Sequence, residues 1–172
     1  MIYYSDDQIS IRTILETDAK TICDQEIEQG WHATEDKYKT RISDNESGKA
    51  IALVAEYEGN VAGYINVYIH AICLNNKYYC SIVDFGVLEK YRNHGIGTKL
   101  MDVAEKIASD YADTVFLDVG LHSGYGSAQR MYVKRGYIPD GKGVWYGKEI
   151  GKPYETYCND DDLNLHFSKK LR

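Results

Sequence analysis

Residues 84–101 of the chain read DFGVLEKYRNHGIGTKLM. An apolar strand pattern ends near Leu88, and a helical pattern begins near Gly95, with a polar turn between them. The turn holds two glycines, Gly95 and Gly97, whose lack of a side chain lets successive backbone N–H groups point at a bound anion. The start of the helix adds unpaired N–H groups and the positive end of its dipole. The stretch therefore predicts a phosphate or pyrophosphate site; the alternative is a glycine-relieved turn that binds nothing.

Two common phosphate motifs do not fit this turn. A Walker loop requires G-x-x-x-x-G-K-[ST], but Gly97 is followed by Thr98 and then Lys99. A dinucleotide-binding fingerprint requires a third glycine at position 100, where the chain has Leu100. Nucleoside triphosphates and dinucleotides bound in those two ways are therefore excluded.

The rest of the chain alternates between two periodicities around this turn. Apolar residues recur every second position in the strand-like segments and every three or four positions in the helix-like segments. Three strands follow one another directly before the turn, and a β-α-β-α-β order follows them. We expect an α/β domain over residues 1–172, a mixed sheet with helices on both faces. The expected strands cover residues 8–14, 51–57, 61–74, 78–87, 114–119 and 162–168, and the expected helices cover 16–27, 34–42, 96–111 and 127–135.

Composition limits the classes of partner. The 20 Lys and Arg against 26 Asp and Glu leave a net charge of −6, which argues against wholesale binding of nucleic acid or of an anionic membrane. The same charge favours a cationic partner. The N-terminus does not resemble a signal peptide, and residues 50–55 form an apolar run too short to span a bilayer. We expect a cytoplasmic protein.

The cysteines form no C-x-x-C pair and no cluster with metal-ligand spacing, so we expect no metal. Cys73 and Cys80 flank an expected turn, but a reducing compartment favours free thiols over a disulfide there. The remaining compositional feature is the presence of 16 Tyr against 3 Phe, a surplus of rings that carry a hydroxyl.

Two segments of the chain resemble a known family. Arg92 to Gly97 has the spacing R-x-x-G-x-G after a strand, and Ala128 to Tyr137 is similar to A-x-x-L-Y-x-x-x-G-F, with Met131 for Leu and Tyr137 for Phe. Both patterns, in this order, resemble the GCN5-related N-acetyltransferases (GNAT family). The resemblance extends to the order of elements along essentially the whole chain, and it implies the GNAT fold and transfer of an acetyl group from acetyl-CoA to an amine.

The resemblance also implies where acetyl-CoA binds. The end of the strand would hold the pantetheine arm as an added strand would. The backbone amides of the turn would hold the pyrophosphate, and Arg92 would add charge. The implied cofactor-binding residues are Phe85, Gly86, Val87, Arg92, Asn93, His94, Gly95, Ile96, Gly97 and Thr98.

Tyr132 matches the tyrosine that acts in the family as general acid toward the CoA sulfur. A phenol, with an ordinary pKa of about 10, is a neutral donor at pH 7. Asp84 lies where many relatives carry an acidic residue, so it is the implied base, acting through water. The alternative for Tyr132 is a ring that only packs in the core. The alternative for Asp84 is a carboxylate at the surface or paired within a loop, in which case a chain of water molecules would act as the base. His122 is either a proton relay or a polar loop residue.

One position departs from the family pattern. Many relatives carry a CoA-binding asparagine seven residues before the tyrosine, where this chain has Tyr125, and Ser123 or Ser127 is a candidate replacement. Aromatic residues of two segments are candidates to line the acceptor cleft, since rings and carboxylates suit a cationic amine. They are Trp31, His32, Trp145, Tyr146, Tyr154 and Tyr157.

We expect the acceptor to be the primary amine of a cationic small molecule. The alternatives are a peptide or protein amine, and a non-catalytic module that binds acyl-CoA. A homodimer is an expectation by analogy with the family.

Overall fold

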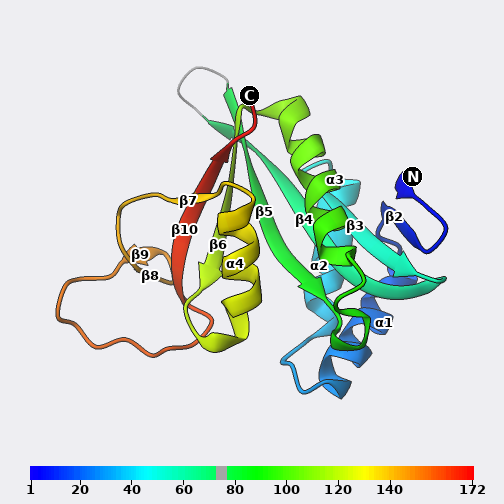
Figure 1. Ribbon diagram of the computed structural model, residues 1–172, viewed down its shortest axis with the longest axis horizontal. Coiled ribbons are helices and arrows are strands. Elements are labelled where there is room, and N and C mark those ends of the chain that lie inside the picture. The colour runs from blue at the N-terminus through cyan, green and yellow to red at the C-terminus, as the bar shows by residue number, and fades with distance from the viewer. Residues whose placement is uncertain (73–76) are drawn as a thin grey trace.

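In the computed structural model of the chain, residues 1–72 and 77–172 are described. Their strands form one ten-stranded sheet in the order β1-β2-β3-β4-β5-β6-β10-β8-β9, with β7 also paired to β10 (Figure 1). The strands are β1 (Ile2–Ser5), β2 (Ile9–Thr13), β3 (Ala50–Tyr57), β4 (Asn60–Ile72), β5 (Lys77–Val87), β6 (Thr114–Gly120), β7 (Ile138–Pro139), β8 (Trp145–Tyr146), β9 (Glu149–Ile150) and β10 (Leu163–Lys170). The helices are α1 (Glu16–Glu28), α2 (Glu35–Glu46), α3 (Ile96–Tyr111) and α4 (Gly126–Lys134), with short 3₁₀ turns η1 (Glu89–Tyr91) and η2 (Ser123–Tyr125).

The predicted meander is confirmed. β3, β4 and β5 pair antiparallel in sequence order. The turn between β3 and β4 uses Glu58 and Gly59, both at positive φ. The sheet is mixed, because β6 then joins β5 in parallel and β10 pairs with β6 antiparallel.

Alternation along the strands gives the sheet two apolar faces. On β3, Leu53 and Ala55 belong to the core that α3 covers, and Ala52 and Val54 belong to the core under α1 and α2. The predicted arrangement, helices on both faces, is therefore confirmed. The apolar stripe of α3 lies fully on the first core, through Ile96, Leu100, Met101, Ala104, Ile107 and Ala108.

Some elements were not predicted. β1 pairs with β2 as an edge hairpin, where Ile2 remains 67% exposed. β7, β8 and β9 have two residues each, too few for an alternating pattern to be visible in the sequence. The second helix continues to Glu46, four residues past the prediction.

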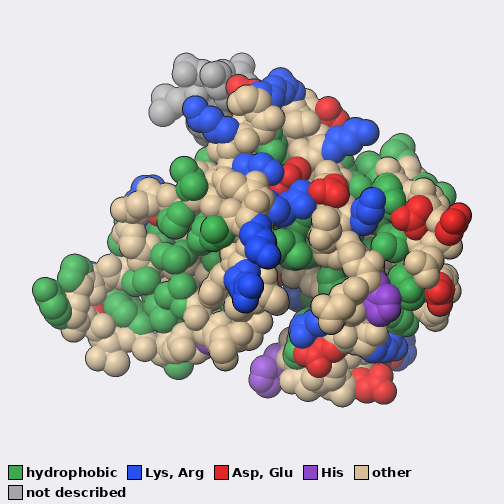
Figure 2. All heavy atoms as spheres, in the orientation of Figure 1, with side chains coloured by type: hydrophobic (Ala, Val, Ile, Leu, Met, Phe, Trp, Pro, Cys, Tyr) green, Lys and Arg blue, Asp and Glu red, His purple; other side chains and the backbone are tan. Residues whose placement is uncertain are grey.

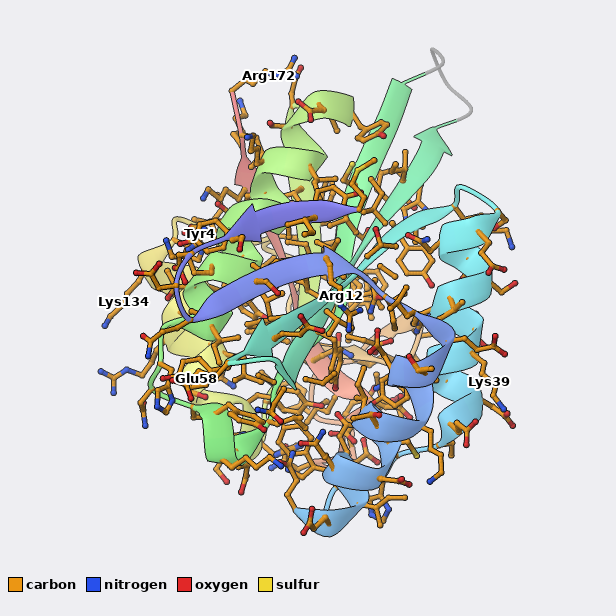
Figure 3. The ribbon with its side chains drawn as sticks, turned by 90° about the vertical axis from the view of Figure 1, so that its right-hand side faces the viewer. Tyr4, Arg12, Lys39, Glu58, Lys134 and Arg172 are labelled. Carbon is orange, nitrogen blue, oxygen red and sulfur yellow. The ribbon has the colours of Figure 1, made fainter. Side chains whose placement is uncertain are left out.

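A charged cluster ties the hairpin to α1. Arg12 of β2 contacts the carboxylates of Asp18 and Glu56, each at 2.6 Å, and Asp18 also accepts a hydrogen bond from the backbone N–H of Leu15 just before the helix. Figure 3 shows Arg12 on this hairpin, with Tyr4 on the neighbouring strand.

Cys23 and Cys80 are buried free thiols and Cys158 is an exposed one. Cys73, the expected neighbour of Cys80, lies outside the described residues.

Candidate active site

The sheet opens into a fork between β5 and β6. The two strands pair only through Cys80–Val115, Ser81–Phe116 and Ile82–Leu117. Beyond the last pair β5 runs on to Val87 and β6 to Gly120, and the ribbons separate (Figure 1). The backbone of β5 past Ile82 thus has no ladder partner on β6. An extended ligand can bind to such an unpaired edge through main-chain hydrogen bonds.

A β-bulge lies in the forked part of β5. Tyr64 pairs with Gly86 and Asn66 pairs with Val83, so β5 has one more residue than β4 over this interval. The extra residue brings Asp84 to a φ of +51°, in the left-handed region. Bulges redirect side chains. Here the bulge accompanies a carboxylate that contacts α2.

Asp84 is ion-paired in the structure. Arg41 donates to its Oδ2 from Nε at 2.7 Å and from Nη2 at 2.6 Å. Lys37 Nζ lies 3.7 Å from Oδ1, and the Asp84 side chain is 22% exposed. Both Arg41 contacts are to Oδ2, and Oδ1 has the more distant contact with Lys37 Nζ.

The turn after β5 leads into α3, whose N-terminus has no side-chain cap. Asn93 and Gly95 have φ values of +66° and +79°, and no side chain caps α3. The first backbone bond into the helix comes from Lys99 N to Gly95 O at 3.1 Å. The N–H groups of residues 96–98 precede that bond and have no acceptor within the helix. Unpaired N–H groups at a helix start are suited to contact an anion.

The side chains of the turn contact protein groups. Arg92 lies 3.3 Å from Glu89, and its guanidinium is 5.5 Å from the centre of the Trp31 ring. His94 Nδ1 is 2.9 Å from the carbonyl oxygen of Arg92, and its ring packs on Tyr57 at 4.6 Å. His94 can therefore serve a ligand through its backbone, while its side chain shapes the turn.

The first turn of α3 fits closely between β5 and α4. A Cβ added at Gly97 would lie 3.2 Å from the Met131 side chain, 3.3 Å from that of Phe85 and 3.4 Å from that of Val87. Glycine at position 97 therefore allows the helix start to approach the forked strand. Phe85, Val87 and Gly97, predicted to lie in one site, are neighbours.

Tyr132 of α4 faces the same region. Its ring centre is 6.4 Å from that of Phe85, and the residue is 5% exposed. Burial raises the pKa of Tyr132 well above its ordinary value, and nearby Tyr125 adds to the shift. The hydroxyl is therefore protonated at neutral pH and can act as a hydrogen-bond donor.

Tyr125 and its neighbours anchor the late segment of the chain. The Tyr125 hydroxyl donates to Asp161 Oδ1 at 2.8 Å, and His122 Nε2 lies 3.0 Å from the same oxygen. His122 Nδ1 accepts from the Gly124 N–H at 3.1 Å, so both ring nitrogens are engaged and the geometry favours a structural role over proton relay. No local sequence pattern indicates the contact between Tyr125 and Asp161, because the two residues are 36 positions apart.

The predicted acceptor residues lie in different surroundings. Trp145 stacks on His166 at 4.1 Å, and Tyr146 packs against Tyr157 and donates to Asp160. Tyr154 is fully exposed. Figure 2 shows the molecule hollowed at its lower edge, between the half that carries these residues and the half that carries α1.

A cavity of about 250 Å³ lies at the fork on the α2 side of the sheet. Its walls come from α2, β4, β5 and β6, which are distant in the chain, so no local sequence pattern indicates the cavity. Its lining residues are Arg41, Tyr68, His70, Ser81, Ile82, Val83, Phe116, Leu117 and Asp118.

Within the described ranges, no helix has the length and apolarity needed to cross a bilayer. The same residues contain no group of three or more His, Cys, Asp or Glu side chains placed to hold a metal.

Comparison with known proteins agrees with this geometry. The chain is structurally similar to Arabidopsis thaliana Naa50 in complex with the bisubstrate analogue CoA-Ac-MVNAL, at 18% identity and a TM-score of 0.69, over 95% of this chain and 99% of that one. A Salmonella typhimurium acetyltransferase that modifies the N-terminal serine of ribosomal protein L7/L12 gives 11% identity and a TM-score of 0.74, over 99% of both chains. Salmonella typhimurium yncA, solved with its cofactor acetyl-CoA, gives 16% identity and a TM-score of 0.69, over 96% of this chain and 95% of that one.

No curated protein sequence matches the chain. The model of the acetyltransferase (GNAT) family, however, matches residues 14–137, well over half of its length. That span contains the forked strand, the uncapped start of α3 and Tyr132. The chain therefore belongs to the GNAT family of acetyltransferases, and acetyl-CoA is its co-substrate.

Proposed function

We propose that the chain, as one domain of residues 1–172, transfers the acetyl group of acetyl-CoA to a primary amine of a cationic small molecule. The observation that carries this proposal is the convergence of an unpaired β5 edge, an uncapped α3 and a buried tyrosine hydroxyl at one fork. Acetyl-CoA supplies an acetyl group activated as a thioester. The protein supplies its binding, its orientation and the proton donor.

The cofactor-binding residues divide into two groups by the chemistry that they offer. The backbone of Phe85, Gly86 and Val87 offers main-chain hydrogen bonds to the amides of the pantetheine arm. The N–H groups of residues 93–98 face the pyrophosphate, with Arg92 as a nearby charge. Because this site is made of backbone, a chain of net charge −6 can bind an anionic cofactor.

Tyr132 and Asp84 are the proposed catalytic residues. The Tyr132 hydroxyl donates a hydrogen bond that stabilises the negative charge developing on the leaving sulfur. Asp84 Oδ1, opposite the oxygen held by Arg41, accepts the proton of the attacking amine through water. Arg41 is then a positioning residue, because it fixes the carboxylate without occupying both oxygens.

The test is an assay of thiol release from acetyl-CoA with a panel of amines. The panel contains an arylalkylamine, a linear diamine, an aminoglycoside, an amino acid and a short peptide with a free α-amine. We expect turnover with at least one small cationic amine.

A peptide or protein amine is the second candidate acceptor, favoured by the similarity to structures of enzymes that act on protein N-termini. Turnover with the peptide alone would support that candidate and reject the small-molecule assignment. Binding of acetyl-CoA without turnover of any amine would instead support a non-catalytic acyl-CoA-binding module.

A further inference from the structure

The cavity at the fork lies on the face of the sheet opposite α3. Val115, Leu117 and Val119 of β6 belong to the core that α3 covers, so alternation places Phe116 and Asp118 on the other face. The last paired residues, Ile82 and Leu117, are part of its lining. At about 3.3 Å per residue, Phe85 is within roughly 10 Å of Ile82 along β5, so the cavity adjoins the strand segment proposed to bind the pantetheine arm.

One wall of the cavity carries a cation that is already paired. Besides its bonds to Asp84, Arg41 donates from Nη1 to the Tyr68 hydroxyl at 2.6 Å. Tyr68 in turn donates to Asp44 Oδ2 at 2.5 Å, and burial raises the pKa of Tyr68 to about 12, which keeps this hydroxyl protonated. The guanidinium is therefore compensated by two carboxylates and offers little to a ligand anion.

The opposite wall carries a carboxylate that no lysine or arginine of the described residues contacts. Asp118 has His166 Nε2 at 3.4 Å from its Oδ1, and its side chain is 62% exposed. A carboxylate at the mouth of a small cavity, which no lysine or arginine of the described residues contacts, is suited to bind an ammonium group.

Aromatic rings line the space between these walls. His70 stacks with Tyr68 at 5.9 Å and with Tyr79 at 4.6 Å, and Phe116 meets Tyr79 edge-on at 5.9 Å. Phe116 is 39% exposed. Such rings favour a flat apolar group and, by cation–π attraction, a neighbouring ammonium. A volume of about 250 Å³ is below the roughly 300–1,000 Å³ of sites for drug-sized ligands, so the group must be compact.

We propose that this cavity is the acceptor pocket, and that it takes a compact amine with a flat apolar body, an arylalkylamine, whose ammonium is bound by Asp118. This assignment rests on the proposed function. It adds a second carboxylate to the site. Asp118 binds the ammonium as the substrate enters, and Asp84 accepts, through water, the proton that this same nitrogen loses before it attacks the acetyl carbonyl carbon.

The experiment uses 2-phenylethylamine as the probe. Asp118→Asn is expected to raise the KM for this amine roughly 10- to 100-fold, the loss typical of a hydrogen bond to a charged group. The KM for acetyl-CoA and the melting temperature should stay unchanged. Asp113→Asn is the matched control, since Asp113 precedes β6 at the end away from the fork and is 76% exposed. Phe116→Ala should raise the KM for 2-phenylethylamine more than that for 1,5-diaminopentane.

Three results would overturn the assignment. The first is an unchanged amine KM in Asp118→Asn while the wild type transfers acetyl groups. The second is a preference for phenylalanine over 2-phenylethylamine, which would indicate that Arg41 binds the carboxylate of the substrate. The third is transfer confined to peptides.

Failure of the proposed function is distinguished by calorimetry. If the wild type acetylates no amine, titration of 2-phenylethylamine into the CoA-loaded protein still measures the pocket. Binding that Asp118→Asn weakens would support the pocket without the transfer reaction, and no binding to the wild type would reject it.

Discussion

Glu26 is a carboxylate with 2% exposure, and the hydroxyls of Tyr38 and Tyr64 both donate to it. Lys37 Nζ lies 5.3 and 5.8 Å from the centres of the two rings. The Tyr64 hydroxyl also occupies the space that a Cβ at Gly86 would take, at 2.6 Å. These tyrosines therefore use their hydroxyls to satisfy a buried carboxyl group next to the forked strand, which explains part of the surplus of tyrosine over phenylalanine.

Replacing Glu26 with leucine should destabilise the fold by about 2–4 kcal/mol, because two buried hydroxyls lose their acceptor. Urea unfolding measures the change. The triple variant Glu26→Leu, Tyr38→Phe, Tyr64→Phe should recover much of the loss, since it removes donors and acceptor together. If Glu26→Leu were as stable as the wild type, the hydrogen bonds of Glu26 would contribute nothing to the free energy of unfolding.

Tyr132→Phe tests the proposed acid. We expect kcat to fall roughly 10- to 1,000-fold while acetyl-CoA affinity is retained, because only the hydroxyl is removed from a ring that remains packed on Phe85. Steady-state kinetics and calorimetry measure the two quantities. Tyr111→Phe is the control, since Tyr111 ends α3 and is 47% exposed. Undiminished turnover in Tyr132→Phe would remove this residue from the mechanism.

At the scale of elements, α3 combines two roles. Its apolar stripe from Ile96 to Ala108 anchors it on the sheet, and its first turn is left without a side-chain cap. The rigid packing of the stripe fixes the direction in which the free N–H groups point, so no ligand-induced folding is needed to form the anion site. The tight fit of Gly97 against Met131 and Phe85 sets the position of that turn.

Gly97→Trp should abolish measurable acetyl-CoA binding, because the indole cannot fit between the turn, α4 and the forked strand. Calorimetry with acetyl-CoA measures the effect, and circular dichroism checks that the fold persists. Gly97→Ala should bind more weakly than the wild type but better than Gly97→Trp, since its methyl group meets mainly the flexible end of Met131. Wild-type affinity in the tryptophan variant would place the pyrophosphate elsewhere.

At the scale of the molecule, one carboxylate links three elements that are distant in sequence. Glu105 of α3 accepts two hydrogen bonds. One comes from Nε of Arg135, the residue that follows α4, at 2.9 Å, and the other from Nζ of Lys169 in β10 at 2.7 Å. Its side chain is 12% exposed. Burial opposes ionisation, but the bonds from Arg135 and Lys169 prevail and lower the pKa of Glu105 below its usual value of 4.5. Figure 3 shows Lys134, the last residue of α4, pointing outward at the edge of the molecule.

Glu105→Gln should reduce the free energy of unfolding by about 2–3 kcal/mol at pH 7, since two cations lose a charged partner. Because the pKa of Glu105 is lower in the folded than in the unfolded state, its ionised form stabilises the protein at pH values above the unfolded-state pKa. This stabilisation is lost as the pH falls through the folded-state pKa. The difference between variant and wild type should therefore shrink below about pH 4.5. Thermal unfolding at pH 7, 5 and 3.5 measures it, and a difference independent of pH would contradict the role of the ionised carboxylate.

Local patterns in the sequence were enough to predict the meander, α3, α4 and the turn at Gly95 and Gly97. Each of these depends on residues close together in the chain, through strand alternation, helical periodicity and the backbone freedom of glycine. The resemblance to the family added the cofactor and a role for Tyr132, and the family match agrees with the cofactor.

The remaining parts of the candidate site depend on how distant segments of the chain pack together. This packing sets the end of β5–β6 pairing at Ile82 and Leu117, the pairing of Asp84 with Arg41 and the cavity that contains Asp118. These contacts join residues 35 or more positions apart, and no local periodicity encodes which side chains will meet across strands and helices. Local patterns and the family resemblance were thus enough to predict a cofactor site, whereas packing between distant elements shapes the cavity that we propose for the acceptor.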